Sequence, residues 1–157
     1  VSAGEFNAPD FVGRIALALQ QYNIHPSLLE LEVTERMALL DIDKMIQVLE
    51  QLNALGVRTA LDDFGTGYSS LSYLTRLPIN TLKIDRSFVR TLPGSEKSQG
   101  VVQLIAGLGH LMGMEIIAEG VERTEELEHI RNAGCEVIQG YLFGKPQSAE
   151  DISRIVN

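Results

Sequence analysis

The chain has 157 residues, enough for one domain with a buried core, because a protein of this size hides roughly 70% of its extended-chain surface. Its 45% hydrophobic and 22% charged residues exclude a disordered or fibrous polymer, and no apolar run approaches the ~20 residues that cross a bilayer. A net charge of −8 argues against a nucleic-acid polymer as partner, since such binding depends on Lys and Arg neutralising phosphates.

The sequence also carries signals about the compartment. Its N-terminus lacks the charged-then-apolar pattern of a signal peptide, and the single Cys135 can form no internal disulfide. We therefore expect a cytoplasmic protein, or the cytoplasmic portion of a membrane-bound parent, with no direct membrane contact from this segment. Cys135 is expected to be a small buried side chain.

The first half of the chain alternates between predicted helices and strands. Apolar residues at helical spacing predict a helix over 11–19, and a strand over 28–33 follows. Asp41 is an expected N-cap for a helix that Gly56 ends, and a short apolar strand over 57–61 comes next.

The second half continues the alternation. Its predicted elements are a brief helix before Pro78, a strand over 81–84, a helix over 101–111 that ends near Gly113, a strand over 115–118, a helix from Thr124 to Gly134, a strand over 136–138, and a final helix with Ser148 and Asp151 as its capping box. Five strands separated by helices predict an α/β fold with a parallel sheet.

Polar residues cluster where these strands end. Right-handed crossovers place all strand C-termini at one edge, where ligands bind in both open sheets and closed barrels. The residues expected there are Glu32, Thr34, Glu35, Asp62, Asp63, Lys83, Asp85, Glu119, Glu122 and Gln139. Carboxylates packed together repel one another unless a cation lies among them, and oxygen-rich clusters suit Mg²⁺, Mn²⁺ or Ca²⁺.

The adjacent acids in TALDDFGTGYSSL suggest a more specific arrangement. Because the backbone turns where a strand ends, Asp62 can point at one ion and Asp63 at a second ion or its water. Two ions ~4 Å apart can clamp the attacked phosphorus centre and the leaving oxygen of a phosphodiester. Lys83 would add positive charge near the nucleophile or a phosphate oxygen. Residues 65–67 are a predicted hinge, and residues 69–70 are predicted N-cap residues of the short helix that follows.

Each of these residues also has a simpler interpretation. Asp62 and Asp63 could form a turn or a cap, and Lys83 could be a solvated strand end. The helix dipole alone favours acids at helix starts, which would account for Glu35, Glu122 and Glu125. Only the joint pattern at one edge favours a functional site over these interpretations.

Five stretches together resemble the EAL domain family of bacterial phosphodiesterases that act on cyclic di-GMP. They are ELEVTER at 30–36, ALDDFGTGYSSLSYL at 60–74, LKIDRSFV at 82–89, IIAEGVE at 116–122 and QGYLFGKP at 139–146. The resemblance implies a TIM-barrel-type fold and cleavage of cyclic di-GMP to linear pGpG with two Mg²⁺ or Mn²⁺ ions.

The resemblance also implies a role for individual residues. Metal ligands would be Glu32, Asp62, Asp63 and Glu119. Catalytic residues would be Asp63, Lys83 near the attacking water, and Glu119 as general base or metal ligand. The supporting residues would be Glu35, which steadies the loop after Asp63, Asp85 beside Lys83, Gln139, which orders the site, and Tyr141 and Pro146 near the guanine pocket.

The sequence departs from the family pattern in one respect. It contains no Glu-Ala-Leu tripeptide, and its opening VSAGEF resembles the end of a family stretch that carries a metal-binding asparagine. Residues 1–157 are therefore expected to be the C-terminal two-thirds of a single EAL domain. Five strands cannot close an eight-stranded barrel, so we expect an incomplete barrel that stays open or forms a homodimer through its edges.

Three functions compete on this basis. The first is a cyclic di-GMP phosphodiesterase, impaired in this fragment and controlled by upstream sensor or GGDEF-type domains in the parent protein. The second is a non-catalytic module that binds cyclic di-GMP and passes on a signal. The third, a phospho-acceptor domain, is disfavoured because its acid pair ends the first strand and its lysine the last.

Overall fold

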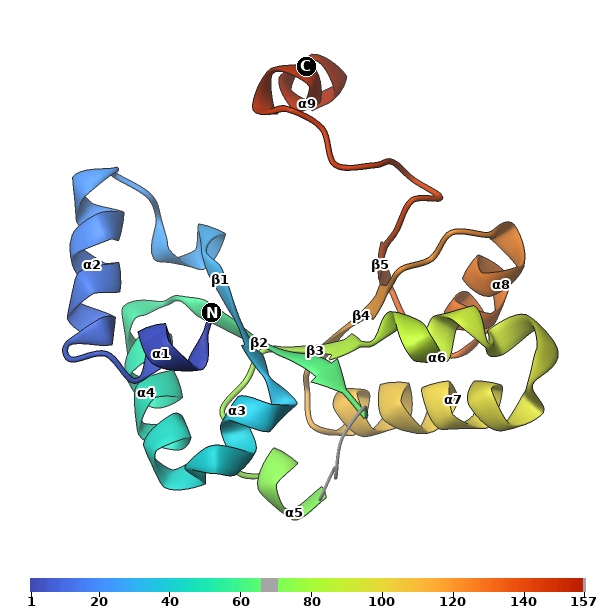
Figure 1. Ribbon diagram of the computed structural model, residues 1–157, viewed down its shortest axis with the longest axis horizontal. Helices are drawn as coiled ribbons and strands as arrows, with labels where there is room; N and C mark the ends of the chain where they lie inside the picture. Colours follow the sequence, from blue (N-terminus) through green and yellow to red (C-terminus); the bar gives the residue numbers. More distant parts are fainter. Residues whose placement is uncertain (66–70, 157) are drawn as a thin grey trace.

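A computed structural model describes residues 1–65 and 71–156 (Figure 1). The second part of the predicted hinge, Thr66 and Gly67, and the predicted caps Ser69 and Ser70 lie outside the described residues. Among the described residues, no helix is both long and apolar enough to span a membrane.

Five parallel strands form one sheet, in the order in which they occur along the chain. They are β1 (Glu30–Thr34), β2 (Arg58–Phe64), β3 (Thr81–Ile84), β4 (Glu115–Glu119) and β5 (Val137–Gln139). All four residues of the central strand β3 are buried, as expected for a strand covered on both faces. The sheet is open, with β1 and β5 at its edges, so the predicted incomplete barrel-type α/β fold is confirmed.

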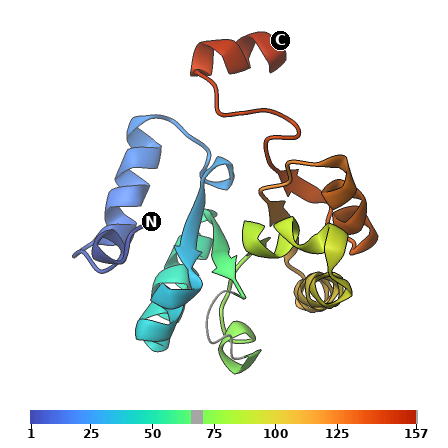
Figure 2. The same cartoon turned by 45° about the vertical axis from the view of Figure 1, so that its right-hand side comes forward.

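Helices flank the sheet in two groups. The helices are α1 (Ala3–Phe6), α2 (Phe11–Gln21), α3 (Glu35–Leu40), α4 (Ile42–Leu55), α5 (Leu71–Leu74), α6 (Arg86–Arg90), α7 (Glu96–Leu111), α8 (Thr124–Asn132) and α9 (Ala149–Val156), with 3₁₀ turns at Pro26–Leu28 and Leu92–Gly94. Figures 1 and 2 both show α1 to α4 beside β1 and β2, and α6 to α8 beside β3 to β5. In both views α9 stands apart from the rest of the chain.

The helix α4 shows how local sequence signals determine an element. The Asp41 side chain accepts a hydrogen bond from the Lys44 N–H at 3.1 Å, which satisfies one of the free donors of the first turn. Gly56 ends the helix with φ = 85°, a left-handed conformation that glycine adopts without steric cost. Leu49 and Leu52 lie on one face and are fully buried against the sheet side of the core.

The core lies between the helices and the sheet. Leu61, Leu82 and Ile116 come from three adjacent strands and are at most 2% exposed. Cys135 is also buried, as predicted, and burial raises the pKa of its thiol to about 11. Because the thiolate is the reactive form, this cysteine is suited to packing and not to chemistry.

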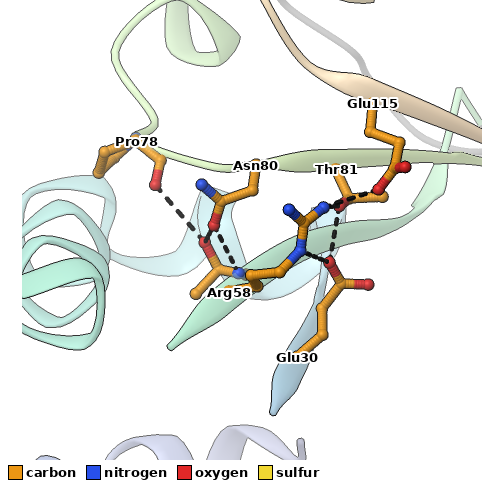
Figure 3. Close-up of polar contacts among 7 residues, drawn as sticks. Glu30, Arg58, Pro78, Asn80, Thr81 and Glu115 are labelled. Atoms are coloured by element: carbon orange, nitrogen blue, oxygen red, sulfur yellow. Dashed lines mark hydrogen bonds and ion pairs between the residues drawn. The ribbon is translucent and has the colours of Figure 1, made fainter. Parts of the chain in front are cut away.

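A polar network joins the first residues of four strands at the amino end of the sheet (Figure 3). Arg58 of β2 contacts Glu30 of β1 at 3.2 Å and Glu115 of β4 at 2.7 Å. Thr81 of β3 accepts a hydrogen bond from Arg58 at 3.2 Å and donates one to Glu30 at 2.7 Å. Charge-assisted bonds of this kind contribute about 1–2 kcal/mol when partly exposed, so the network holds the strands together away from the strand C-termini.

Candidate functional site

The register of the parallel strands brings the predicted site residues to one edge. Thr34 lies opposite Asp62, Ile84 opposite Ala118, and Glu119 opposite Gln139. The strand C-termini therefore meet at the edge opposite the Arg58 network, which is where parallel α/β proteins bind their ligands.

Lys83 is the centre of this edge. Its Nζ forms a short ion pair with Glu32 and lies 2.6 Å from Glu119 Oε1 and 3.4 Å from Asp62 Oδ1. The lysine is only 4% exposed, so it is a buried group and not a solvated strand end. Four neighbouring strands, β1 to β4, thus contribute one residue each to a single charged cluster.

The cluster contains more negative than positive charge, because three carboxylates surround one ammonium group. Burial raises the pKa of Glu119, and repulsion from Asp62 and Glu32 adds to this effect while Lys83 opposes it. Burial alone would lower the pKa of Lys83, but its bonds to Glu119 and Glu32 outweigh this and raise it. Lys83 is therefore charged at neutral pH.

The adjacent acids lie in a β-bulge of β2. Leu61 pairs with Leu82 and Phe64 pairs with Ile84, so two residues, Asp62 and Asp63, stand opposite one residue of β3. The strand therefore continues to Phe64 instead of ending at residue 61 as the apolar pattern predicted. The bulge directs Asp62 toward the lysine, and the Asp63 N–H donates to Asp62 Oδ1 at 3.0 Å.

Asp63 has an unusual backbone conformation and environment. Its φ is 57°, in the left-handed region that aspartate and asparagine tolerate better than most residues. Desolvation, followed by repulsion from Asp62 and Asp85, raises the pKa of Asp63. The bulge thus holds a second carboxylate close to the Lys83 cluster.

Glu35 lies where it can support the loop after β2. It is the first residue of α3 and is 2% exposed, and its Oε2 accepts a hydrogen bond from the Gly65 N–H at 3.1 Å. Burial, followed by the nearby Glu35 carboxylate, raises the pKa of Tyr73 on α5. The helix-start position considered for Glu35 is correct, and its side chain also reaches the backbone that follows Asp63.

Asp85 has mainly a capping contact. Its Oδ1 accepts a hydrogen bond from the Ser87 N–H at 2.9 Å at the start of α6. Burial favours a higher pKa for Asp85, but the hydrogen bonds from Ser87 outweigh it and lower the pKa. Within the described part of the chain, Asp85 forms no ion pair with Lys83.

A cleft of about 470 Å³ opens beside Glu119. Gln139, Tyr141 and Pro146 line it, so three predicted supporting residues share one cavity with a predicted metal ligand. Its lining also includes the cations Arg86, Arg90 and Lys145, none of which the sequence analysis singled out. The Lys145 Nζ lies 5.7 Å from the centre of the Tyr141 ring, close enough for a cation–π contact.

One signal could have identified part of this cationic lining. Arg86 and Arg90 are four residues apart, a spacing that places both on one face of a helix, and the structure shows that they lie in α6. Lys145 lies in the irregular segment between β5 and α9, where no helical spacing indicates its position in the cleft.

Glu126 holds the loop that carries one wall of the cleft. It is 1% exposed, and its Oε2 accepts hydrogen bonds from the N–H groups of Glu122 at 2.9 Å and Arg123 at 3.0 Å. Its Oε1 accepts from the Arg123 Nη2 at 2.6 Å, and the same nitrogen donates to the Arg90 carbonyl at 3.3 Å. This role of Glu126 was not evident from the sequence, because the partners of its side chain come together only in the folded loop.

The hydrogen bonds of Glu126 predict how the stability of the fold depends on pH. Burial opposes ionisation of Glu126, but the bonds from Glu122 and Arg123 outweigh it and lower its pKa below the ordinary 4.5. The carboxylate should therefore stabilise the fold above about pH 4.5, and this contribution should disappear as the pH falls through the lowered folded-state pKa. Thermal unfolding of Glu126→Gln should show a large deficit against the wild type at pH 7 and a smaller one at pH 4.

A matched control lies on the same helix. Glu128 is exposed on α8, so Glu128→Gln should unfold like the wild type at both pH values. An equal deficit for Glu126→Gln at pH 7 and pH 4 would contradict the proposed contribution of the ionised carboxylate.

The donor set at the Lys83 cluster fits a divalent cation in its chemistry. Glu32, Asp62 and Glu119 supply carboxylate oxygens from different strands that already meet around one positive charge, and hard divalent ions prefer such ligands. As these side chains stand, no three Asp, Glu, His or Cys residues of the described ranges are arranged to hold a metal ion. The position between the carboxylates is taken by the lysine.

Comparison with known proteins identifies the family. A model of the EAL domain matches residues 1–146. The bifunctional diguanylate cyclase/cyclic di-GMP phosphodiesterase MucR of Pseudomonas aeruginosa is 43% identical over 152 residues, which are 97% of this chain and 22% of MucR. The cyclic di-GMP phosphodiesterase NbdA of the same species is 42% identical over 144 residues, which are 92% of this chain and 18% of NbdA.

Solved structures agree with this match. The MucR phosphodiesterase in complex with cyclic di-GMP superposes with a TM-score of 0.92 at 43% identity, over 97% of this chain and 62% of that chain. A manganese and cyclic di-GMP complex of BlrP1 from Klebsiella pneumoniae gives 0.84 at 34% identity, over 90% of this chain and 36% of that one. The chain spans about a fifth of the length of the two curated relatives. It belongs to the EAL domain family.

Proposed function

We propose that this chain is the C-terminal two-thirds of an EAL domain whose site hydrolyses cyclic di-GMP to linear pGpG with the help of Mg²⁺ or Mn²⁺. The main support is the convergence of Glu32, Asp62 and Glu119 around one cation at the carboxyl edge of the sheet. The relatives named as cyclic di-GMP phosphodiesterases, and the solved relatives that contain the dinucleotide, support the choice of substrate.

The divalent cations would take part in the chemical step, and the cleft would bind the substrate. Divalent cations held by Glu32, Asp62, Asp63 and Glu119 would stabilise negative charge on the phosphodiester and lower the pKa of water. Glu119 would accept a proton, a role supported by its position at both the Lys83 cluster and the cleft. Lys83 would supply positive charge beside the scissile phosphate, and Glu35 would hold the loop after Asp63 through the Gly65 N–H.

The cleft itself would bind and orient the dinucleotide. Arg86 and Lys145 offset the overall negative charge of the chain at this place and would attract phosphate oxygens. Tyr141 offers an aromatic face to a guanine base, with Gln139 and Pro146 beside it. These contacts depend on the protein alone and not on a metal.

This independence favours a second candidate function, that of a module which binds cyclic di-GMP without cleaving it. The two functions differ in how binding responds to metal removal. Isothermal titration of the chain with cyclic di-GMP, with Mg²⁺ or with a chelator, should show binding that is markedly stronger with the metal. Equal affinity in both conditions would favour the binding module, and no binding in either would refute both proposals.

Product analysis tests the reaction. Chromatography of cyclic di-GMP incubated with the chain and Mn²⁺ should show pGpG at a rate far below that of intact EAL domains, because this chain lacks the Glu-Ala-Leu glutamate. Turnover at the rate of intact domains would contradict the proposed impairment.

We also propose that the chain forms a homodimer. Neither β1 nor β5 pairs with a further described strand along its outer edge, and such edges favour pairing with a second copy to form a homodimer. Light scattering that finds a monomer at the concentrations used for titration would contradict it. By analogy with the bifunctional relative MucR, we propose that sensor or GGDEF-type domains precede this segment in the parent protein.

A further inference from the structure

The Lys83 ammonium occupies the position where the three carboxylates meet. Its Nζ lies within ion-pair distance of carboxylate oxygens of Glu32, Asp62 and Glu119, at 3.4 Å for Asp62 and closer for the other two. The side chain is 5% exposed, so water contributes little to the solvation of this charge. The carboxylates are therefore the main partners of the lysine, and the lysine is the cation that holds them together.

Lysine and a divalent cation would need the same oxygen atoms. One ammonium balances only one of the three surrounding carboxylates, so the cluster keeps a net negative charge that attracts a further cation. A metal ion that binds these oxygens at coordination distance would come close to the ammonium, and like charges repel strongly where water is scarce. Both cations therefore cannot keep all of their contacts at once.

We propose that Lys83 is a built-in counter-ion, which holds Glu32, Asp62 and Glu119 together before a divalent cation binds and is displaced from them when the cation binds. This inference rests on the proposed metal-dependent function. It assigns to Lys83 a positioning role that is separate from any contact with the substrate.

The position of Lys83 in the fold suits such a displacement. Its neighbours in β3, Leu82 and Ile84, are fully buried, so the backbone at this point is held in the middle of the sheet. The side chain ends in a compact charge on a flexible four-carbon stem, so the ammonium can move while the backbone stays in place. The backbone of Lys83 is thus held rigidly, while its charged end group can move.

The proposal predicts a gain in metal affinity when the competing charge is removed. Lys83→Met keeps the length and volume of the stem without the charge. In titration calorimetry, Mn²⁺ should bind Lys83→Met about tenfold more tightly than the wild type, a coupling of ordinary size for two competing ligands. In the absence of metal, the melting temperature of Lys83→Met should be lower than that of the wild type, and added Mn²⁺ should narrow this difference.

A second lysine provides the electrostatic control. Lys145 lines the neighbouring cleft and contacts Tyr141, not the three carboxylates. Lys145→Met removes the same charge from the same side of the molecule, so its Mn²⁺ affinity should change less than about threefold if competition for shared oxygens is the cause. A similar gain in both variants would overturn the proposal in favour of a general charge effect.

The outcomes separate this inference from the proposed function. If the wild type binds Mn²⁺ and Lys83→Met binds it equally or more weakly, the counter-ion role is wrong and the metal site stands. If neither binds Mn²⁺, both are wrong. Should Lys83→Met fail to fold, the proposal can be tested with a crystal structure of the wild type in which Mn²⁺ is located by anomalous scattering. A Lys83 Nζ still within 4 Å of all three carboxylates beside the bound ion would overturn the proposal.

Discussion

Replacing Glu32 with Gln should weaken Mn²⁺ binding at least ~100-fold, whereas replacing Glu30 with Gln should leave it unchanged. Loss of a residue that merely supports a metal ligand already costs 10- to 100-fold in affinity, and we propose Glu32 as a ligand itself. The amide of glutamine keeps the shape of the side chain but removes the charge that the cation requires.

The two glutamates form a closely matched pair. Both lie on β1, two residues apart, so their side chains point to the same face of the sheet. Glu30 bonds to Arg58 and Thr81 in the amino-end network, and Glu32 bonds to Lys83 in the site. Glu30→Gln should therefore lower the stability of the fold without affecting the metal.

Titration calorimetry with Mn²⁺ measures how the affinity for the ion differs between the two variants. Glu32→Gln also removes one of the carboxylates that hold Lys83, and a more loosely held lysine should compete less with the metal ion. A net weakening of Mn²⁺ binding would therefore be strong support for Glu32 as a metal ligand. If Glu30→Gln weakens Mn²⁺ binding as much as Glu32→Gln, the effect is one of total charge and the site assignment is wrong.

Replacing Gly140 with Ala should destabilise the chain by more than about 3 kcal/mol, at the severe end of single substitutions. An added Cβ would lie 2.0 Å from the Val121 carbonyl oxygen and 2.4 Å from the Val121 nitrogen. These are backbone atoms and cannot rotate away. They are also held in place, since the Val121 N–H donates to the Gln139 carbonyl at 3.2 Å and the Leu142 N–H donates to the Val121 carbonyl at 3.0 Å.

Relief of this clash would separate the ends of β4 and β5. Gln139 and Tyr141, on either side of Gly140, would then shift in the cleft, so binding of cyclic di-GMP should be lost together with stability. Urea unfolding and ligand titration give the two readouts.

Gly144 is the matched control, because it lines the same cleft and an added Cβ there meets no atom within 4 Å. Gly144→Ala should change stability by less than about 0.5 kcal/mol. Equal losses in both glycine variants would show that flexibility of the segment, and not the close approach to Val121, is what glycine provides.

The sequence predicted elements well where local signals determine them. The strand over 81–84 has the predicted bounds, and α4 begins after Asp41 and ends at Gly56 as expected. The bulge in β2 was not predicted, because an extra residue is defined by the register against the partner strand and leaves little trace in the strand's own pattern. The extent of the short helix α3 was not predicted either, although Glu35 was considered as a helix-start acid, since the strand before it runs directly into it.

The candidate site was predicted unevenly for a similar reason. The rule that parallel strands end at one edge was enough to place Glu32, Asp62 and Glu119 together. It did not show that Lys83 is buried among them, or that Glu126 holds the loop beside the cleft, because both facts depend on side-chain packing across elements. The role of Asp85 as a helix cap likewise became clear only from its contact with Ser87.

The left-handed conformation of Asp63 limits how this position can change over evolutionary time. Most side chains would pay a conformational penalty of about 1–3 kcal/mol there, while asparagine and glycine tolerate the geometry. Asn or Gly at residue 63 would therefore remove the carboxylate that we propose as a metal ligand and still allow the fold. In paralogous proteins, we expect those two replacements where the proposed catalysis has been lost and ligand binding has been kept.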